Sequence, residues 1–464
     1  MDQWLLYGVI AYLAGQLAIG VWVSRRVKTE RDYLLAGRSF GPTIAAFTVF
    51  ATWFGAETCM SAAGLAYSEG LSGTGSEPFG YALCLVLMAV VFAVPLWKRG
   101  LTTLADLFRE RYGQGVERLA VLLMVPTSVL WAAAQIRAFG LVLSHTSGVS
   151  PELAITGAAI VVLLYTSSGG LWADAMTDVV QGVVLIGGLI VMAIVVLVFA
   201  EPHAVSSLPM ERLSLREATE SPLAFAELFA VPILGSVMSQ ELVQRVTASR
   251  SPQVARNSTL IAAAAYLTVG LIPLLLGLVA ADLLPGIADP EQVLIVMARE
   301  YLPFWLQLML ICALISAMLS TVDSALLVAG SLLAHNLVFS RQNVGERARL
   351  LGDRAGVAFS GLVAFGLALA SNSVHDMVQE ASSFGSAGVL VIAVFALFTK
   401  FGGRVSATAA LVCGLGSYIA GAHVLELEAP FLASVMAAIA AYVGVAVVEA
   451  RGGDPAPSTA PDVT

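Results

Sequence analysis

The stretch from Thr48 to Ala66, TVFATWFGAETCMSAAGLA, decides how the whole chain is interpreted. It lies within an apolar segment long enough to cross a bilayer, yet it contains the carboxyl group of Glu57. A charged side chain at that depth costs about 2.5–3.5 kcal/mol on insertion scales and therefore marks a functional site. Gly55 and the small residues around it weaken the helix there, and a weakened helix leaves backbone carbonyl groups able to bind a cation. The stretch predicts one half of a site for an ion and a solute.

The composition of the 464 residues indicates a membrane protein. Hydrophobic residues make up 58% of the chain and charged residues only 12%, which is half of the roughly 25% typical of soluble domains. A helix needs about 20 apolar residues to cross the hydrocarbon core. We expect thirteen such spans, at residues 4–24, 42–67, 78–97, 119–144, 151–168, 173–200, 223–246, 257–283, 304–338, 355–371, 377–399, 405–424 and 429–448.

The connections between these spans are short, so the sequence predicts a single membrane domain over residues 1–450. Its core repeats would occupy about 42–200 and 223–399. Residues 284–303 are expected to be a plain connection, with a short amphipathic helix on the membrane surface as the alternative. The Pro-, Ala-, Ser- and Thr-rich residues 451–464 predict a disordered cytoplasmic tail.

Cysteines and histidines give no sign of a metal centre. The histidines are scattered, and the cysteines lie in apolar segments without CxxC spacing, so we expect small core residues at Cys59, Cys84, Cys312 and Cys413. An intramembrane enzyme using Glu57, Asp178 and Asp323 as acid and base groups is an alternative. Because the sequence shows neither a paired nucleophile nor a metal cluster, we expect no enzyme activity, and nothing suggests nucleic acid.

Lysine and arginine are distributed unequally between the two sides of the membrane. If the N-terminus is outside, 20 of the 24 basic residues fall on the inner side, and Arg137 lies within a span. The three on the outer side are Arg212, Arg216 and Arg299. Because cytoplasmic loops carry an excess of basic residues, we expect a multi-pass plasma (inner) membrane protein with its N-terminus outside and its C-terminus in the cytoplasm.

The five spans from residue 42 to 200 and the five from 223 to 399 form two groups. An odd number of crossings makes the second group enter from the opposite side, which gives inverted topology. The first span of each group is interrupted, by Gly55 in one and by Pro232 and Gly235 in the other, and proline removes an intrahelical hydrogen bond. Paired interrupted helices at corresponding positions indicate the binding site of a transporter.

The span at 304–338 contains the most specific local pattern, SAMLSTVDS. Small and hydroxyl side chains at i, i+3, i+4 and i+7 lie on one helix face: Ala317, Ser320, Thr321 and Ser324. Hydroxyl oxygens suit a small hard cation such as sodium, and the carboxyl group of Asp323 lies near the same stripe. The alternative is that these hydroxyl groups join helices or bond to their own backbone.

Residues 165–181, YTSSGGLWADAMTDVVQ, form the tight connection between two spans. Gly169 and Gly170 turn the chain, and Asp174 and Asp178 follow at i and i+4. A helix dipole favours an acidic residue in the first turn, which explains Asp174 better than Asp178, one turn deeper.

With these motifs the chain resembles the sodium/solute symporter family, whose members take up sugars, proline, pantothenate, sialic acid, monocarboxylates, iodide or choline. The resemblance is carried by YTSSGGLWADAMTDVVQ, by SAMLSTVDSALLVAGSLLAHNL (316–337), by LVQRVTA (242–248) and by VQEASSFGSAG (378–388). It implies an all-α membrane protein of about 13 transmembrane helices. Its core would be LeuT-like, with a 5+5 inverted repeat and extra helices at both ends. It also implies sodium-coupled import of a small polar organic solute, such as an amino acid or amine, by alternating access.

The same resemblance implies the residues that bind Na+, the expected cofactor. One site would lie between the spans at 42–67 and 304–338. For it the resemblance implies the backbone carbonyl groups of Ala51, Phe54 and Ala317 and the hydroxyl groups of Ser320 and Thr321. For a second sodium ion nearer the cytoplasm, used by some members, it implies Asp178, Ser320, Asp323 and Ser324.

The sequence departs from its relatives where the solute binds. The motif Gln-Glu-Tyr-Thr-Gly reads Gln379-Glu380-Ala381-Ser382-Ser383 here, and residues 231–236 lack the polar and aromatic groups of the sugar transporters, so we do not expect a sugar. Glu57 and Arg137 either form a structural ion pair or bind a zwitterion or an amine. The candidate substrate-binding residues are Trp53, Glu57, Arg137, Ser236, Gln240 and Gln379.

Two further alternatives stay open. Glu57 would allow proton coupling in a transporter of the same fold, and related folds serve as membrane input domains of sensors, here without an output module. The expected partners are a small-molecule solute, sodium ions and the lipid bilayer, and the sequence leaves the oligomeric state open.

Overall fold

The computed structural model describes residues 3–25, 27–74, 76–216, 221–339, 345–371 and 373–451. Within these ranges it consists of helices and loops and contains no β-strand. The tail expected beyond Arg451 lies outside the described residues. The α-helices are α1 (Gln3–Ser24), α2 (Glu30–Leu35), α3 (Pro42–Trp53), α4 (Ala62–Ser68), α5 (Phe79–Leu87), α6 (Ala93–Arg99), α7 (Leu104–Tyr112), α8 (Gln114–Ser147), α9 (Pro151–Ile194), α10 (Pro222–Ala230), α11 (Gln240–Ala248), α12 (Pro252–Leu283), α13 (Val293–Tyr301), α14 (Phe304–Ser331), α15 (Glu346–Ala370), α16 (Val374–Ser383), α17 (Ser386–Phe398), α18 (Arg404–His423) and α19 (Pro430–Arg451).

The helices confirm a multi-pass membrane protein, but not the expected number of spans. Among the described residues, 10 helices are long and apolar enough to cross a membrane, or 11 if the bent pair Pro222–Gly235 and Gln240–Ala248 counts as one span. The spans expected at 42–67 and 151–168 contain shorter apolar helices, Pro42–Trp53 and Pro151–Leu164. Both are shortened by interruptions: α3 stops before Phe54, and the backbone of Gly170 inside α9 is not helical.

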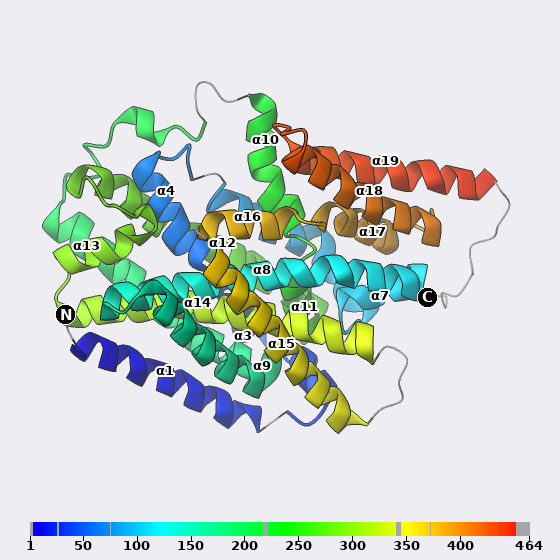
Figure 1. Cartoon of the computed structure of the whole chain (residues 1–464), viewed down its shortest axis with the longest axis horizontal. Coiled ribbons are helices and arrows are strands. Elements are labelled where there is room, and N and C mark those ends of the chain that lie inside the picture. Colours follow the sequence, from blue (N-terminus) through cyan, green and yellow to red (C-terminus); the bar gives the residue numbers. More distant parts are fainter. Residues whose placement is uncertain are drawn as a thin grey trace.

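Helix α14 lies in the middle of the bundle, and every residue from Leu310 to Ser331 is buried. A helix that is apolar all round has to be covered on all sides, and α14 packs against α3, α8, α9 and α15. In Figure 1, α1 lies at one edge of the bundle, and α18 and α19 extend at the opposite edge. The segment 284–303, expected to be a plain connection, instead contains the helix α13, which buries its apolar face against α12 and α14.

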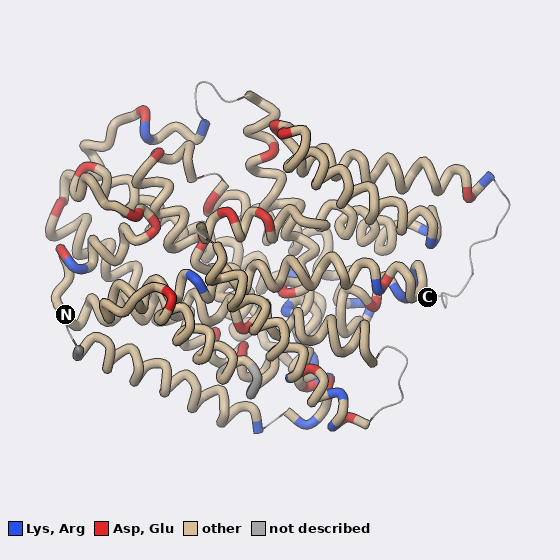
Figure 2. Tube along the Cα trace, viewed as in Figure 1, with Lys and Arg blue, Asp and Glu red and all other residues tan. Residues whose placement is uncertain are grey.

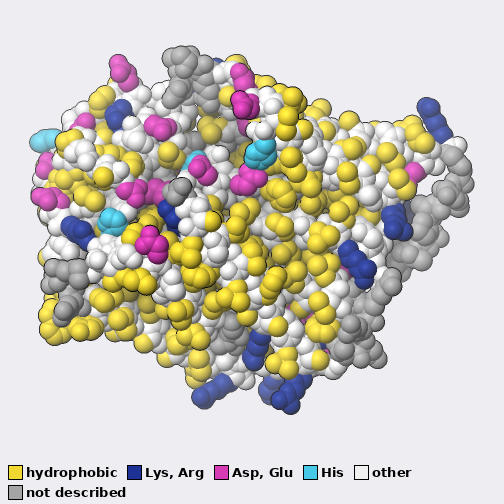
Figure 3. All heavy atoms as spheres, in the orientation of Figure 1, with side chains coloured by type: hydrophobic (Ala, Val, Ile, Leu, Met, Phe, Trp, Pro, Cys, Tyr) yellow, Lys and Arg dark blue, Asp and Glu magenta, His cyan; other side chains and the backbone are white. Residues whose placement is uncertain are grey.

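Apolar and charged side chains divide the surface into zones. Figure 3 shows a broad hydrophobic band across the middle, with acidic side chains gathered at the upper left and most basic ones at the bottom and right. Figure 2 shows the same separation along the chain trace. The prediction of four buried cysteines is wrong for Cys413, which is exposed on α18, whereas the other three are buried. An exposed thiol on an apolar surface is compatible with a helix that faces lipid.

The two interrupted helices form as the sequence predicts. Helix α3 ends at Trp53, and the chain continues after Phe54 as the π-helical segment η2 (Glu57–Ser61) before α4 begins. Helix α10 continues through the π-helical segment η6 (Val231–Gly235), and α11 starts after a break. Helix α16 packs against both η2 and η6, so the two interruptions share one neighbour.

The close approach of α4 and α12 requires glycine. A Cβ atom on Gly277 would lie 2.1 Å from the carbonyl oxygen of Ala63, which belongs to the backbone and cannot turn aside. We expect Gly277→Ala to lower stability by about 1–3 kcal/mol because the two helices must separate. Thermal unfolding of the purified protein in detergent measures this effect. Gly416→Ala in α18, where a Cβ would meet nothing within 4 Å, is the matched control, and equal melting temperatures for the two variants would contradict the prediction.

Candidate ion and solute site

The end of α3 exposes its backbone to neighbouring helices. The N–H of Ala56 donates to Oε1 of Gln135 in α8, at 2.8 Å, instead of to a carbonyl group of α3. The carbonyl oxygen of Thr52 accepts from the hydroxyl of Thr321 in α14, at 3.0 Å. The last carbonyl groups of a helix lack intrahelical partners, and here the carbonyl oxygen of Thr52 is directed at α14.

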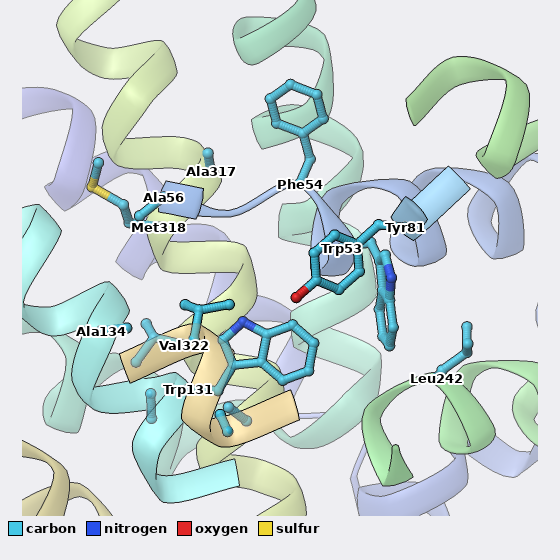
Figure 4. Close-up of a cluster of buried hydrophobic side chains, with 14 of the residues drawn as sticks. Trp53, Phe54, Ala56, Tyr81, Trp131, Ala134, Leu242, Ala317, Met318 and Val322 are labelled. Carbon is cyan, nitrogen blue, oxygen red and sulfur yellow. The ribbon is translucent and has the colours of Figure 1, made fainter. Parts of the chain in front are cut away.

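The hydroxyl stripe of α14 faces this break. Thr321 Oγ1 also lies 3.1 Å from the carbonyl oxygen of Ala317, and Ser324 Oγ lies 3.2 Å from Oγ1 of Thr52. Figure 4 shows Phe54 and Ala317 on the facing segments. The structure therefore brings together the two elements that carry the expected sodium ligands.

Asp178 of α9 faces the same stripe. Its carboxylate accepts hydrogen bonds from the hydroxyl groups of Ser320 and Thr48, and the aspartate is fully buried. Of the second expected ion set, Asp178 and Ser320 are thus in direct contact, and the hydroxyl of Thr48 joins them. Thr48 was not foreseen, because only the tertiary packing of α3 on α9 shows which hydroxyl of α3 meets the carboxylate.

The other two residues of that set have different partners. Ser324 contacts the ion pair of Asp174 and Arg245. Nη2 of Arg245 lies 2.5 Å from Oδ2 of Asp174, and the same nitrogen donates to the hydroxyl of Ser324. Asp323 accepts a hydrogen bond from Thr166 in the first half of α9. The expected second set is therefore not one cluster, because successive residues of a helix point about 100° apart.

Arg245 departs from the sequence-based expectation. Arg245 is one of the 20 basic residues expected on the inner side, at the end of the span 223–246, yet it is 0% exposed. Three buried aspartates, Asp174 and Asp178 of α9 and Asp323 of α14, lie where these two helices meet, and among the described residues the one ion pair in this cluster is that of Asp174 with Arg245. Buried charges are stable only when they are paired, neutralised or bound to a cation. The oxygen-rich surroundings suit a hard monovalent cation such as Na+, and no group of three or more His, Cys, Asp or Glu suited to a metal occurs in the described chain.

A cavity of about 500 Å³ lies beside the break in α3. Its described lining has six acidic residues and no lysine or arginine. Glu57 and Glu77 are buried in its wall. The other four acidic residues are Glu227, Asp376, Glu380 and Glu428.

Both buried glutamates have an oxygen atom without a partner. Oε2 of Glu57 accepts from Nε2 of Gln135, at 2.9 Å, and Oε2 of Glu77 accepts from the hydroxyl of Tyr266, at 3.0 Å. The Oε1 atoms of both glutamates are buried without a hydrogen-bond partner. Glu77 was missed, because it follows a polar loop and only its packing against Tyr266 and Thr58 buries it.

Aromatic rings surround the same region. Trp53 and Trp131 meet edge to face with centroids 5.4 Å apart, and Tyr81 lies between Trp131 and Tyr266 at 6.5 Å and 6.4 Å. Figure 4 shows Trp53, Tyr81 and Trp131 next to one another. Tyr81 lines the acidic cavity together with Glu57 and Glu77, so carboxylates and aromatic rings face the same space.

The expected substrate-binding residues are placed in three groups. Glu57 and Gln379 line the acidic cavity, and Trp53 packs against Trp131. Ser236 and Gln240 line a smaller neighbouring cavity of about 30 Å³. Oε1 of Gln240 accepts from the N–H of Leu104, at 2.6 Å, so that side chain also fastens α11 to α7.

Arg137 belongs to neither cavity, and the expected ion pair with Glu57 is absent from the described residues. Gln135, two residues earlier in α8, contacts Glu57 instead. Two residues are about 200° of a helix turn, so Arg137 faces elsewhere: its guanidinium lies 3.4 Å from the carbonyl oxygen of Ala368 in α15 and lines a separate cavity with Glu291.

Gln135 fixes both the break in α3 and the carboxylate of Glu57. We expect Gln135→Leu to leave two buried polar groups unpaired, at a cost of about 1–3 kcal/mol each. The melting temperature should fall, and solute affinity should fall with it. Gln16→Leu is the matched control, because Gln16 is also a buried glutamine but donates only to Tyr12. Unchanged solute affinity in a folded Gln135→Leu variant would contradict a role in orienting Glu57.

Comparison with known proteins identifies the family. The model of the "Sodium:solute symporter family" matches residues 33–416. The chain belongs to this family. High affinity choline transporter 1 of Homo sapiens is 27% identical to the protein over 448 residues, covering 90% of this chain and 76% of the relative. High-affinity choline transporter 1 of Caenorhabditis elegans is 26% identical over 396 residues, covering 78% of this chain and 68% of the relative.

A solved structure confirms the expected fold of this family member. The substrate-bound outward-open structure of a Na+-coupled sialic acid symporter superimposes with a TM-score of 0.84 at 18% identity, covering 96% of this chain and 97% of that one. The protein therefore has the LeuT-like fold of a solute symporter, and the expectation of a transporter rather than an enzyme is confirmed.

Proposed function

We propose that the protein couples inward sodium flow to the import of a small organic cation with a substituted ammonium group, of the size and type of choline. The observation that carries the proposal is the acidic cavity beside α3, where two buried carboxyl groups each have an unpartnered oxygen atom. A carboxylate-bearing solute would meet repulsion from Glu57 and Glu77. A cation would instead neutralise buried charge.

The aromatic rings support the same class of solute. Ammonium ions with apolar substituents are attracted to the faces of Trp and Tyr, by about 2 kcal/mol or more when desolvated. Tyr81 lines the cavity beside the two carboxylates, and Trp131 and Tyr266 pack against its ring. The names of the relatives, which are choline transporters, agree with this chemistry.

The interruption of α3 connects ion and solute. A sodium ion bound by Ala51, Phe54, Ala317, Ser320 and Thr321 would be coordinated by backbone carbonyl groups at the C-terminal end of α3, on the side of the break that faces α14. The same break orients Glu57 through Gln135 on the other side. Each ligand would therefore raise the affinity for the other by the same factor. In this proposal Asp178 and Ser320 provide a second ion position, and the N-terminus lies outside, so that the acidic cavity opens to the exterior.

Uptake into proteoliposomes tests the proposal. Radiolabelled choline should accumulate when sodium is present outside and potassium inside, and it should not accumulate with potassium on both sides. Excess unlabelled choline or another quaternary amine should compete, and proline should not. Uptake driven by a proton gradient without sodium would favour the proton-coupled alternative. Competition by carboxylated solutes but not by amines would refute the cationic substrate.

A further inference from the structure

Basic side chains gather at one end of the helix bundle, far from the acidic solute cavity. Four candidate spans begin or end there: Phe79–Arg99, Gln114–Ser147, Val374–Phe398 and Arg404–His423. The short helix α7 packs between them, against α8 and α17. Figure 1 shows the ends of α7, α8 and α17 on the right, and Figure 2 shows blue segments in the same place. We call the following six residues the basic cluster: Lys98, Arg99, Arg111, Arg118, Lys400 and Arg404.

The connection from α17 to α18 brings the basic cluster together. The guanidinium group of Arg111 in α7 donates to the carbonyl oxygen of Gly402 in this connection, at 2.9 Å. The guanidinium group of Arg99, at the end of α6, donates to the carbonyl oxygen of Ala396 in α17, at 3.3 Å. Two arginines from helices distant in the chain therefore contact the same short segment.

The remaining members of the cluster lie around the same connection. Arg404 lies against the start of α8, because a Cβ atom on Gly115 would be 2.7 Å from its Nη2 atom. Arg118 follows Gly115 by three residues and lies on the same face of α8. Lys98 is in the last turn of α6, and Lys400 belongs to the connection itself.

The charges of the basic cluster are not compensated within the described chain. The ion pairs among the described residues involve other basic groups and none of these six. Glu110 and Glu449 lie beside the cluster. The buried carboxylates of Asp106 and Glu117 are already paired with Arg109. Six positive charges beside two negative ones favour an anionic ligand.

Exposed apolar side chains border the basic cluster. Phe398, Phe401 and Val405 are 49%, 38% and 59% exposed, and they precede, belong to and follow the connection between α17 and α18. The ends of membrane spans lie where lipid head groups meet the hydrocarbon core. The cluster therefore has charged groups at head-group level and apolar groups next to them.

The connection has a fixed conformation. The hydroxyl of Tyr442 in α19 donates to the carbonyl oxygen of Phe401, at 2.8 Å, and its ring stacks on Phe395 with centroids 4.0 Å apart. Gly402 adopts φ 75°, and a Cβ atom there would lie 2.6 Å from the ring of Tyr442. Because the segment is held in place beforehand, a ligand of the cluster pays little for ordering it.

The chemistry of the cluster fits a phospholipid. Guanidinium groups match the oxygen atoms of phosphate, and basic pockets between membrane helices suit anionic head groups. We propose that the basic cluster binds the phosphate group of an anionic phospholipid, whose acyl chains lie against Phe398, Phe401 and Val405. In the proposed orientation this lipid belongs to the inner leaflet. An acidic soluble partner would use the charges but leave the apolar side chains uncovered. The lipid site does not depend on the proposed sodium and solute sites.

Titration of the purified protein with phosphatidylglycerol, followed by native mass spectrometry, tests the proposal. Arg118→Gln/Arg404→Gln removes two exposed charges of the cluster. The dissociation constant of the first bound lipid should rise by about fivefold or more, since one basic residue at an anionic surface contributes about that factor. Arg250→Gln/Arg256→Gln is the matched control, because it removes the same charge from exposed positions near the start of α12. It should bind phosphatidylglycerol like the unmodified protein.

Two other ligands identify what the cluster recognises. Phosphatidylcholine, which has acyl chains but no net charge, should bind the unmodified protein at least fivefold more weakly than phosphatidylglycerol. Inorganic phosphate at the same concentration as the lipid should not displace it. Val405→Ser should weaken the binding of phosphatidylglycerol, because it removes an apolar contact for the acyl chains.

Several outcomes would overturn the lipid site. Equal weakening in the two double variants would mean a general effect of charge, and an unchanged dissociation constant in Arg118→Gln/Arg404→Gln would mean that the cluster binds no lipid. Equal affinity for the two lipids would exclude recognition of the phosphate charge. Displacement by inorganic phosphate would make the cluster an anion site without a lipid. Melting temperatures measured without lipid show that each variant is folded, and Arg118→Gln alone takes the place of a double variant that is not.

Discussion

Replacing Asp178 with asparagine is expected to abolish sodium-driven accumulation. The Asp178 carboxylate is fully buried and accepts from Ser320 and Thr48, so its negative charge directly contacts the hydroxyl stripe of α14 at Ser320. Losing a charged ligand of this kind costs about 3 kcal/mol, which corresponds to a roughly 100-fold weaker interaction. Sodium titration of initial uptake rates should show a half-saturating concentration raised by about that factor, or no saturation.

A neighbouring variant distinguishes this effect from general damage. The hydroxyl of Thr177, also buried, bonds only to carbonyl oxygens of its own helix. Thr177→Ala should therefore leave the sodium dependence unchanged. If Asp178→Asn folds and keeps the sodium dependence of the unmodified protein, Asp178 is no ion ligand and the second position in the proposed mechanism is wrong.

The features that depend on residues close together in the chain, which are the face of a helix and the positions where a helix breaks, could be predicted from the sequence. The spacing of Ala317, Ser320 and Thr321 places them on one face of a helix, and the structure directs that face to the break in α3. The interruptions at Gly55 and Gly235 follow from glycine and proline. At Gly55, a Cβ would lie 2.6 Å from Oε2 of Glu57, so a side chain at this position would displace that carboxylate.

Features set by contacts between distant helices could not be predicted in the same way. Whether Glu57 meets Gln135 or Arg137 depends on the rotation of α8, and two residues differ by about 200°. Arg245 has the pattern of a basic residue at a span end, and only its contacts with α9 and α14 explain its burial. The directions of Asp323 and Ser324 differ for the same reason, so that the predicted ion set divides between two places.

Neutralising Glu57 is expected to have the largest effect on solute recognition. Glu57→Gln keeps the shape of the side chain and an acceptor for Gln135 but removes the buried charge. For a choline-type solute we expect affinity to fall by a factor of about 30–100, or about 2–3 kcal/mol. Equilibrium binding measured with saturating sodium gives the comparison. Glu380→Gln is the matched control at the cavity: its side chain is 35% exposed, and charges near solvent are worth about 1 kcal/mol or less.

An uncharged analogue of choline tests why Glu57→Gln is expected to lose affinity for the solute. In the carbon analogue of choline a quaternary carbon replaces the nitrogen, so shape is conserved and charge is not. The unmodified protein should strongly prefer choline to this analogue, because Glu57 and Glu77 gain nothing from a neutral solute. In Glu57→Gln the affinity for choline should fall and the affinity for the analogue should hardly change. The ratio of the two affinities should therefore fall by nearly the same factor as the affinity for choline. Equal losses for both compounds would mean that Glu57 acts through the packing of α3 and α8 rather than through its charge, and the cationic substrate would lose its main support.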